Sequence, residues 1–217
     1  MENRFVNTHT HFLESQHLSL FQAENSVVNQ LFSYGIHPWE AARKVWNQDV
    51  FLHSNCLAIG ECGLDKLRGP AIEIQEKVFR MQVELSEKHQ KPLILHCVKT
   101  WEEIRKIKRD LKPHQTWIFH GLAKVNLMQE VIDEGLIPSF GKALLFNSKL
   151  LEEVAKVELN QFLLETDDAV FHIEHIYKAI ATAKNIPLQA VIKAQNENFN
   201  RIFEHGKMVG THGTSAE

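Results

Sequence analysis

Short apolar segments alternate with longer amphipathic segments along most of the chain. Most of the apolar segments are four to six residues long, which is typical of buried strands rather than helices. They cover residues 5–11, 18–23, 31–36, 57–61, 93–96, 117–120, 136–140 and 162–167. Between the later segments, apolar residues recur at spacings of three and four, which predicts helices with one buried face. These helices are expected around residues 74–85, 101–111, 127–132, 150–157 and 173–180, and from Pro187 onward.

The alternation of strands and helices predicts a parallel sheet, and eight candidate strands predict a closed (β/α)8 barrel of the TIM type. Such barrels usually need about 250 residues, whereas this chain has 217. Only residues 12–17 separate the first two strands, and only residues 24–30 separate the next two. A parallel crossover usually takes about a dozen residues or more. We therefore expect a trimmed barrel that is irregular near its first three strands.

Composition and charge narrow the domain organisation, the compartment and the partners. We expect residues 1–205 to form a single domain and the polar segment 206–217 to be a flexible tail. Three cysteines without a Cys-x-x-Cys pair favour a reducing cytoplasm. No segment is apolar for long enough to span a bilayer, and no feature indicates an obligate protein partner. A formal charge of -3 argues against a broad basic face for nucleic acid, so a phosphate would be bound locally by a few groups or a metal.

Side chains that can bind metal ions stand at the end of several predicted strands. His9 and His11 are two residues apart, so they project from the same face of the first strand. Four later strands are expected to end in Glu61, His96, His120 and Asp167. The carboxyl ends of the strands of a (β/α)8 barrel meet at one rim, where active sites lie. The pattern therefore brings four imidazoles and two carboxylates together.

Each of these residues also has an ordinary interpretation. Two histidines at this spacing arise easily by chance in a chain with 13 of them. His96 and His120 are compatible with histidines at the edge of a core, and Asp167 with a helix N-cap. Their joint occurrence at the same end of the strands favours a metal site. Such a set can hold two divalent ions, with one carboxylate bridging them, and can activate a water molecule. Imidazole ligands favour Zn or a similar ion, and carboxylate-rich sites favour Mg.

Several motifs together resemble those of TatD-type metal-dependent hydrolases, within the amidohydrolase superfamily. The matching segments are NTHTH, YGIHPWE, AIGECGLDK, PLILHC, FHG, LIPSFG, LLETDD and NFNRIF, which run from Asn7 to Phe203. The resemblance implies a (β/α)8 barrel that cleaves phosphodiester bonds, typically in DNA, with two divalent ions (Zn, Mn or Mg). It implies that His9, His11 and Asp167 hold one ion, that His96 and His120 hold the other, and that Glu61 bridges them. Asp167 would also position or deprotonate the attacking water, and His37 and Asp65 would lie near the site.

Other positions depart from the family pattern. Asn7 stands where the family usually has Asp, and Lys99 is present where an arginine is common. Lys99 and Lys124 are the candidates for substrate contacts in these segments, although lysine does not replace the bidentate phosphate binding of arginine. These changes leave two alternatives to a DNA-cleaving enzyme. One is hydrolysis of an amide, a lactone or a small phosphate ester, and the other is an inactive barrel that serves as a binding or scaffold protein.

The tryptophans are expected to be structural. Trp39, Trp46, Trp101 and Trp117 are too few and too scattered to form an array for base stacking. We expect them to pack in the core or against helices.

Overall fold

The computed structural model describes residues 4–13, 17–23 and 29–204 of the chain. All eight predicted strands are present, and they form one parallel sheet in sequence order. The strands are β1 (Val6–Thr10), β2 (Leu18–Ala23), β3 (Phe32–Tyr34), β4 (Cys56–Asp65), β5 (Leu93–Val98), β6 (Trp117–Phe119), β7 (Ile137–Phe140) and β8 (Leu163–Leu164). The (β/α)8 prediction is confirmed.

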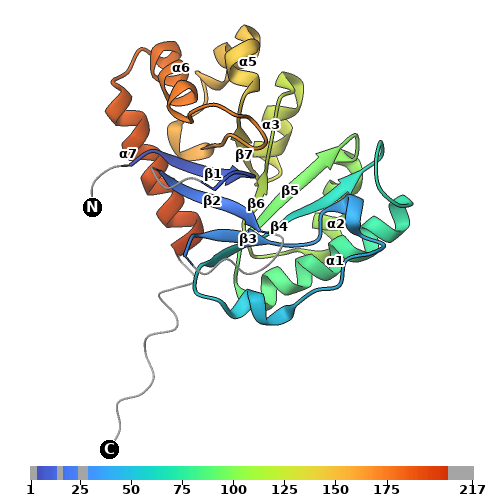
Figure 1. Cartoon of the computed structure of the whole chain (residues 1–217). Coiled ribbons are helices and arrows are strands. Elements are labelled where there is room, and N and C mark those ends of the chain that lie inside the picture. Colours follow the sequence, from blue (N-terminus) through green and yellow to red (C-terminus); the bar gives the residue numbers. More distant parts are fainter. Residues whose placement is uncertain (1–3, 14–16, 24–28, 205–217) are drawn as a thin grey trace, which may run out of the picture.

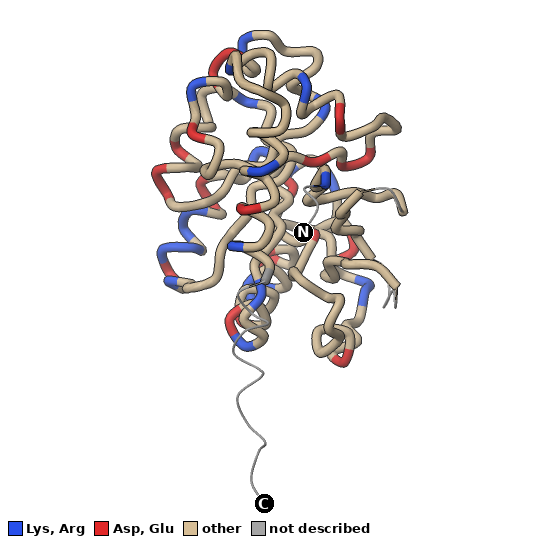
Figure 2. The backbone as a smooth tube through the Cα atoms, turned by 90° about the vertical axis from the view of Figure 1, so that its left-hand side faces the viewer, with Lys and Arg blue, Asp and Glu red and all other residues tan. Residues whose placement is uncertain are grey.

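Helices cover the outside of this sheet. Figure 1 shows α1 and α2 beside β3–β5, α3, α5 and α6 together on another side, and α7 next to β1 and β2. The helices are α1 (Ile72–His89), α2 (Trp101–Leu111), α3 (Val125–Asp133), α4 (Ala143–Phe146), α5 (Ser148–Val154), α6 (Glu174–Lys184) and α7 (Leu188–Phe199). Among the described residues, no helix is both long and apolar enough to cross a bilayer. Acidic and basic residues alternate along the backbone in Figure 2, in keeping with the small net charge.

The barrel is trimmed near its first three strands, as the short connections predicted. The described parts of the connections after β1 and β2 contain no helix, and β3 is followed only by the 3-10 turns η1 (Pro38–Glu40) and η2 (Gln48–Leu52). The described parts of these crossovers are therefore loops and 3-10 turns rather than α-helices. The expected tail over residues 206–217 lies outside the described residues.

Strands β1 and β8 close the barrel with few backbone hydrogen bonds. At the carboxyl end of the seam, His11 N donates to Asp167 O, and Asp167 N donates to His9 O, both at 3.0 Å. Further along the seam, hydrogen bonds of side chains take the place of backbone hydrogen bonds between the two strands. The Asn7 amide accepts from Thr166 N at 3.0 Å and donates to Thr166 Oγ1 at 2.8 Å. Asn7 therefore holds the seam together, which gives a structural reason for an amide at this position.

The amino-terminal end of the barrel is filled with apolar side chains. Residues from the first half of the strands pack with Phe199, Ile202 and Phe203, which belong to α7 and to the following π-helical turn η4 (Asn200–Glu204). The strand residues in this cluster include Val6, Leu20, Ala58, Ile94, Ile118 and Leu163. Burying each large side chain is worth about 1.5–3 kcal/mol. This layer leaves the carboxyl end of the barrel as the place for polar groups.

Candidate metal centre

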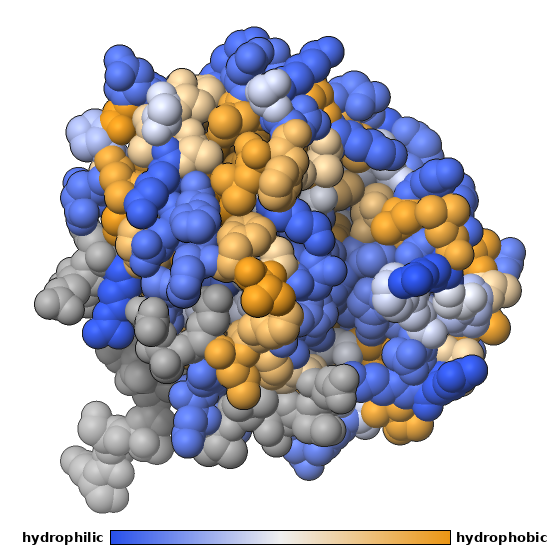
Figure 3. Space-filling view, turned by 45° about the horizontal axis from the view of Figure 1, so that its top comes forward, coloured by the Kyte–Doolittle hydropathy of each residue, from blue (hydrophilic) through white to orange (hydrophobic). Residues whose placement is uncertain are grey.

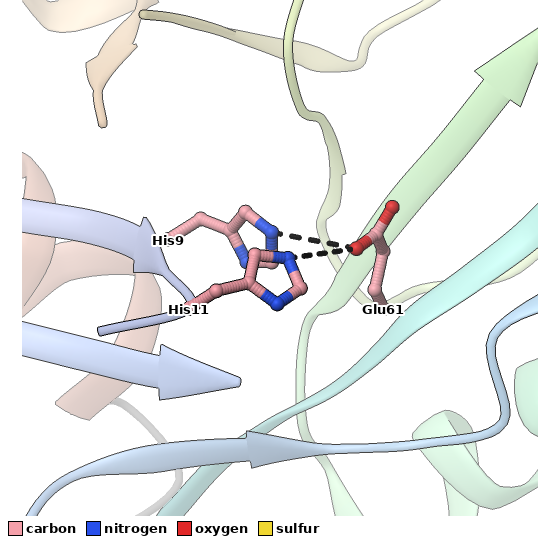
Figure 4. Close-up of side chains that lie close together, drawn as sticks. All are labelled: His9, His11 and Glu61. Atoms are coloured by element: carbon pink, nitrogen blue, oxygen red, sulfur yellow. Dashed lines mark ion pairs between the residues drawn. The ribbon is translucent and has the colours of Figure 1, made fainter. Parts of the chain in front are cut away.

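Strand β1 delivers two imidazoles to the carboxyl end of the barrel. His9 lies within β1 and His11 directly after it, and both point towards Glu61 on β4 (Figure 4). Each Nε2 lies 3.5 Å from Glu61 Oε2. The same two nitrogens lie 3.5 and 3.4 Å from Asp167 Oδ1. The period-two spacing in the sequence thus becomes a pair of rings that face the same two carboxylates.

Glu61 stands at the centre of the cluster. The sequence suggested that its strand ends at this residue, but β4 continues to Asp65, so that prediction was wrong. Between Ile59 and Cys62 the pairing of β4 with β5 shifts its register, and such irregularities re-aim side chains. The inward position of Glu61 therefore depends on a local distortion of a long strand, which hydrophobic patterning does not predict.

The two oxygens of Glu61 contact two different groups of histidines. Oε2 faces His9 and His11, whereas Oε1 lies 2.5 Å from His96 Nδ1 and 2.8 Å from His120 Nε2. His37 Nε2 also lies 3.2 Å from Oε1. A carboxylate with one oxygen directed to each group has the arrangement expected of a bridging ligand.

His96 and His120 come from β5 and from the residue after β6. His96 is followed by two more strand residues, so it does not end its strand as predicted. His9 and His120 stand next to each other, with ring centroids 4.6 Å apart. Three groups of donor atoms lie close enough to share an ion: His9, His11 and Glu61; His9, His120 and Asp167; and His37, Glu61 and His96.

The donor set fits divalent ions. His9 is 1 % exposed, and among the described residues neither of its ring nitrogens meets hydrogen-bond geometry with a protein group. The separations of 3.4–3.5 Å between the donors of His9, His11, Glu61 and Asp167 are close to the ~3.3 Å edge of a tetrahedral site with bonds of about 2.0 Å. A buried imidazole whose nitrogens form no close hydrogen bond is costly unless something binds it.

The carboxylates and imidazoles stabilise each other's charged forms. Burial raises the pKa of Glu61, but the positive potential of His120 and the hydrogen bonds of the surrounding histidines outweigh it and hold the pKa well below its usual value. The pKa of Asp167 is lowered in the same way, because its contacts with His11 and His9 outweigh burial. Hydrogen bonds that the His11 imidazole donates to Asp167 and Glu61 raise its pKa to about 9. Both carboxylates are therefore ionised and suited to a cation.

Two further residues belong to the surroundings of the cluster. Asp65 Oδ2 lies 3.2 Å from His96 Nε2, so it contacts a candidate ligand from behind. Glu165 is completely buried, accepts a hydrogen bond from Gly121 N at 2.7 Å and lies 3.4 Å from His120 Nδ1. Glu165 was missed in the sequence, although it lies within the LLETDD motif, because a carboxylate beside a strand end has no pattern of its own.

A cavity of about 760 Å³ opens over the cluster. It is lined by candidate ligands, by Asp168 and by Trp39, which is 39 % exposed. Trp39 therefore does not pack in the core, which was one of the two positions expected for it. The cause is local, because Trp39 stands on the short turn η1 in a connection that lacks an α-helix.

Lys99 and Lys124 do not line this cavity. Both are exposed and line a neighbouring cavity of about 320 Å³, together with Trp101 and Phe119. Lys99 follows β5 with a positive φ of 54°, and Lys124 precedes α3. Among the described residues that line the metal cavity, Lys44 is the one lysine, and arginine does not occur.

Comparison with known proteins identifies a matching family model and several related sequences. A family model described as TatD related DNase matches residues 4–204. The TATDN1 homologue from Vairimorpha ceranae, named as a deoxyribonuclease, is 29% identical, and the match covers 78% of this chain and 74% of that protein. A protein from Bacillus subtilis named as metal-dependent hydrolase YabD is 27% identical, over 78% of this chain and 75% of that protein.

Comparison with solved structures identifies proteins with the same fold. A hydrolase TatD family protein from Entamoeba histolytica superposes with a TM-score of 0.72 at 14% identity, over 92% of this chain and 98% of that chain. At this identity the likeness concerns the fold alone. The match of the family model extends over nearly all of the described barrel and over every candidate ligand. The chain therefore belongs to the TatD related DNase family, a family of metal-dependent hydrolases.

Proposed function

We propose that this chain is a divalent-metal-dependent phosphodiesterase that cleaves DNA by means of a water molecule activated by two ions. The observation that carries the proposal is the position of Glu61, whose two oxygens contact separate groups of imidazoles beneath an open cavity. Family membership supports the same reaction, since the matching model describes DNases. The identity of the ions, Zn, Mn or Mg, is part of what the experiment below measures.

The chain's own residues have distinct roles in this proposal. His9, His11 and Asp167 would hold one ion, His96 and His120 would hold the other, and Glu61 would contribute to both. When bound, such ions neutralise charge on the phosphoryl group and lower the pKa of a bound water. His37 contacts the same Glu61 oxygen as His96, which supports a role as an additional ligand or as a substrate contact.

Asp167 is the candidate general base. Its side chain is 28% exposed, whereas that of Glu61 is 4% exposed, so Asp167 is the carboxylate that water in the cavity can reach. It would orient the attacking water and accept its proton. Asp65 and Glu165 would keep His96 and His120 in the required orientation, as carboxylates behind metal-ligating histidines commonly do.

Lys99 and Lys124 would contact phosphates outside the metal cavity. In the part of the chain that the structure describes, neither forms an ion pair, and they line the same neighbouring cavity. A polymer that extends from the metal centre past the ends of β5 and β6 would reach them. We also retain the proposal of a cytoplasmic location, which is supported by the three cysteines, all of them free thiols.

A second candidate is hydrolysis of a smaller substrate, such as a small phosphate ester, a lactone or an amide. The composition of the metal cavity favours it, because the lysine that lines this cavity, Lys44, already donates a hydrogen bond to Gly35 O. A small substrate does not need several cationic side chains in the cavity, whereas a chain of phosphates would. An inactive scaffold is disfavoured, because all six candidate ligands are present.

One preparation can test these alternatives. The protein is freed of metal with EDTA, reconstituted separately with Zn, Mn or Mg, analysed for bound metal, and assayed on single-stranded DNA, RNA, a small phosphodiester and a lactone. We expect about two ions per chain and metal-dependent cleavage of the DNA. Glu61→Gln should abolish turnover and lower the bound metal without changing the circular dichroism spectrum. Failure to bind any ion would exclude the proposal, and cleavage of the lactone alone would favour the second candidate.

A further inference from the structure

Exposed apolar side chains follow the carboxyl ends of several strands. Hydrophobic patches lie among hydrophilic side chains on the face that Figure 3 brings forward. Large exposed hydrophobic residues follow the carboxyl ends of several strands, namely Phe12, Leu13, Trp39, Leu67, Phe146 and Val170. Of these described residues, only Trp39 lines the cavity of the metal centre. Its indole lies close to two histidines of the cluster, with ring centroids 4.5 Å from His37 and 5.8 Å from His96.

The Trp39 indole is held in place by the β4–α1 loop. Its Nε1 donates a hydrogen bond of 2.7 Å to Asp65 Oδ2. The other oxygen of Asp65 accepts from Leu67 N at 2.7 Å and from Arg68 N at 3.2 Å. Asp65 is almost completely buried, so these bonds are shielded from water. The ring is therefore fixed before any ligand binds, which reduces the entropy cost of binding.

Arg68 covers part of this indole and remains exposed itself. Its guanidinium carbon lies 4.6 Å from the centroid of the Trp39 ring. Among the described residues, Arg68 forms no ion pair, so its charge is available to a ligand. The close approach of the two loops depends on Gly69, where φ is +90° and an added Cβ would lie 3.0 Å from both Pro38 O and Trp39 Cα.

We propose that Trp39 and Arg68 form a subsite for an unpaired nucleotide next to the bond that is cleaved. Aromatic rings and guanidinium planes stack on bases of any sequence, and arginine also binds the adjoining phosphate. Trp39 adjoins His37 and His96, so a base on this subsite would lie beside the metal centre. The proposal rests on the phosphodiesterase function above and adds to it the two residues that contact the base and the phosphate beside the bond that is cleaved.

The alternative is that the Trp39–Arg68 contact only joins two loops. The experiment compares two fluorescent oligomers of equal length, one of thymidine and one of abasic tetrahydrofuran units, which carries the same phosphates but no bases. Binding is measured by fluorescence anisotropy in EDTA, where no cleavage occurs, and turnover is measured with Mn. The variants are Trp39→Ala, Trp39→Phe and Arg68→Ala. Arg109→Ala, which removes an exposed arginine from α2, is the control for charge.

We expect Trp39→Ala to weaken binding of the thymidine oligomer about tenfold, in line with the loss of one base stack, and to leave the abasic oligomer unaffected. Trp39→Phe should recover most of the loss, Arg68→Ala should weaken the thymidine oligomer more than the abasic one, and Arg109→Ala should do neither. Equal losses for both oligomers in the Trp39 and Arg68 variants would overturn the proposal. If Trp39→Ala does not fold, Trp39→Phe and Arg68→Ala decide the question, through the loss in affinity for the thymidine oligomer relative to that for the abasic oligomer. Absence of cleavage by the wild type with any metal would instead refute the phosphodiesterase function, while the anisotropy ratio would still report on the subsite.

Discussion

Replacement of Tyr177 by phenylalanine is expected to weaken the closure of the barrel. Tyr177 on α6 is completely buried, and its hydroxyl donates to Val6 O at 2.8 Å and accepts from Val6 N at 3.0 Å. Leu18 N bonds to Phe5 O, so in the parallel ladder the N–H and C=O of Val6 point away from β2. The hydroxyl thus takes the place of a neighbouring strand at the amino-terminal end of β1. Burial also raises the pKa of Tyr177, which keeps the hydroxyl protonated and able to donate.

The magnitude follows from these two contacts. The substitution keeps the ring and its edge contact with Phe5 at 5.1 Å, but leaves two backbone groups of Val6 buried without their partner. An unsatisfied buried polar group costs about 1–3 kcal/mol. We therefore expect Tyr177→Phe to lower the free energy of unfolding by about 2–4 kcal/mol. For a chain of this size, that corresponds to a decrease in Tm of roughly 5–15 °C.

Urea unfolding followed by circular dichroism measures this difference. The chain offers a matched control, since Tyr34 is the only other tyrosine. Its hydroxyl accepts from Asn47 N at 3.2 Å, and Asn47 is exposed, so water can replace the lost oxygen. Tyr34→Phe should cost less than about 1 kcal/mol. Equal effects of the two substitutions, or a loss below about 1 kcal/mol for Tyr177→Phe, would refute the view that Tyr177 completes the seam.

Three further predictions concern the site and the thiols. Glu165→Gln keeps the size of the side chain but removes the negative charge behind His120, and should weaken metal binding by about 10–100-fold in calorimetric titration; unchanged affinity would show that Glu165 only caps Gly121 N. Saturating metal should raise the stability of the EDTA-treated protein by about 2.7 kcal/mol at a hundredfold excess over Kd, measured as a shift in Tm that a chelator reverses. Burial raises the pKa of Cys56 from 9.0 to about 11. The folded state therefore favours the protonated thiol, and this contribution to stability is lost as the pH rises from 9.0 to about 11. Below that range iodoacetamide should alkylate Cys56 far more slowly in the native than in the unfolded protein, as peptide mapping by mass spectrometry would show.

Much of the fold can be read from local sequence patterns. Each of the eight apolar segments became a strand, because a buried parallel strand needs a short continuous apolar run and little else. The number of residues between the segments also explains why the described parts of the connections after β1 and β2 contain no helix. The direction of His9 and His11 is local as well, since the period of two along a strand decides which side chains share a face.

Other features of the site depend on contacts between segments far apart in the sequence. Glu61 reaches both groups of histidines because β4 shifts its register against β5, and no property of residues 57–61 alone predicts that shift. Glu165 acts on His120 across 45 positions of sequence, and Trp39 is fixed by Asp65 at the end of β4. Lys99 and Lys124 looked equivalent to site residues in the sequence, yet in the structure they line a neighbouring cavity.

The sequence by itself thus determined the strands, their order and the identity of the six candidate ligands. Only the tertiary structure decided which oxygen of Glu61 faces which histidine, how Asn7 and Tyr177 close the seam, and that Trp39 lies at the rim of the cavity rather than in the core. The physical reason is that periodicity and burial act on each segment separately. The distances between donor atoms, by contrast, are set by the packing of all eight strands together.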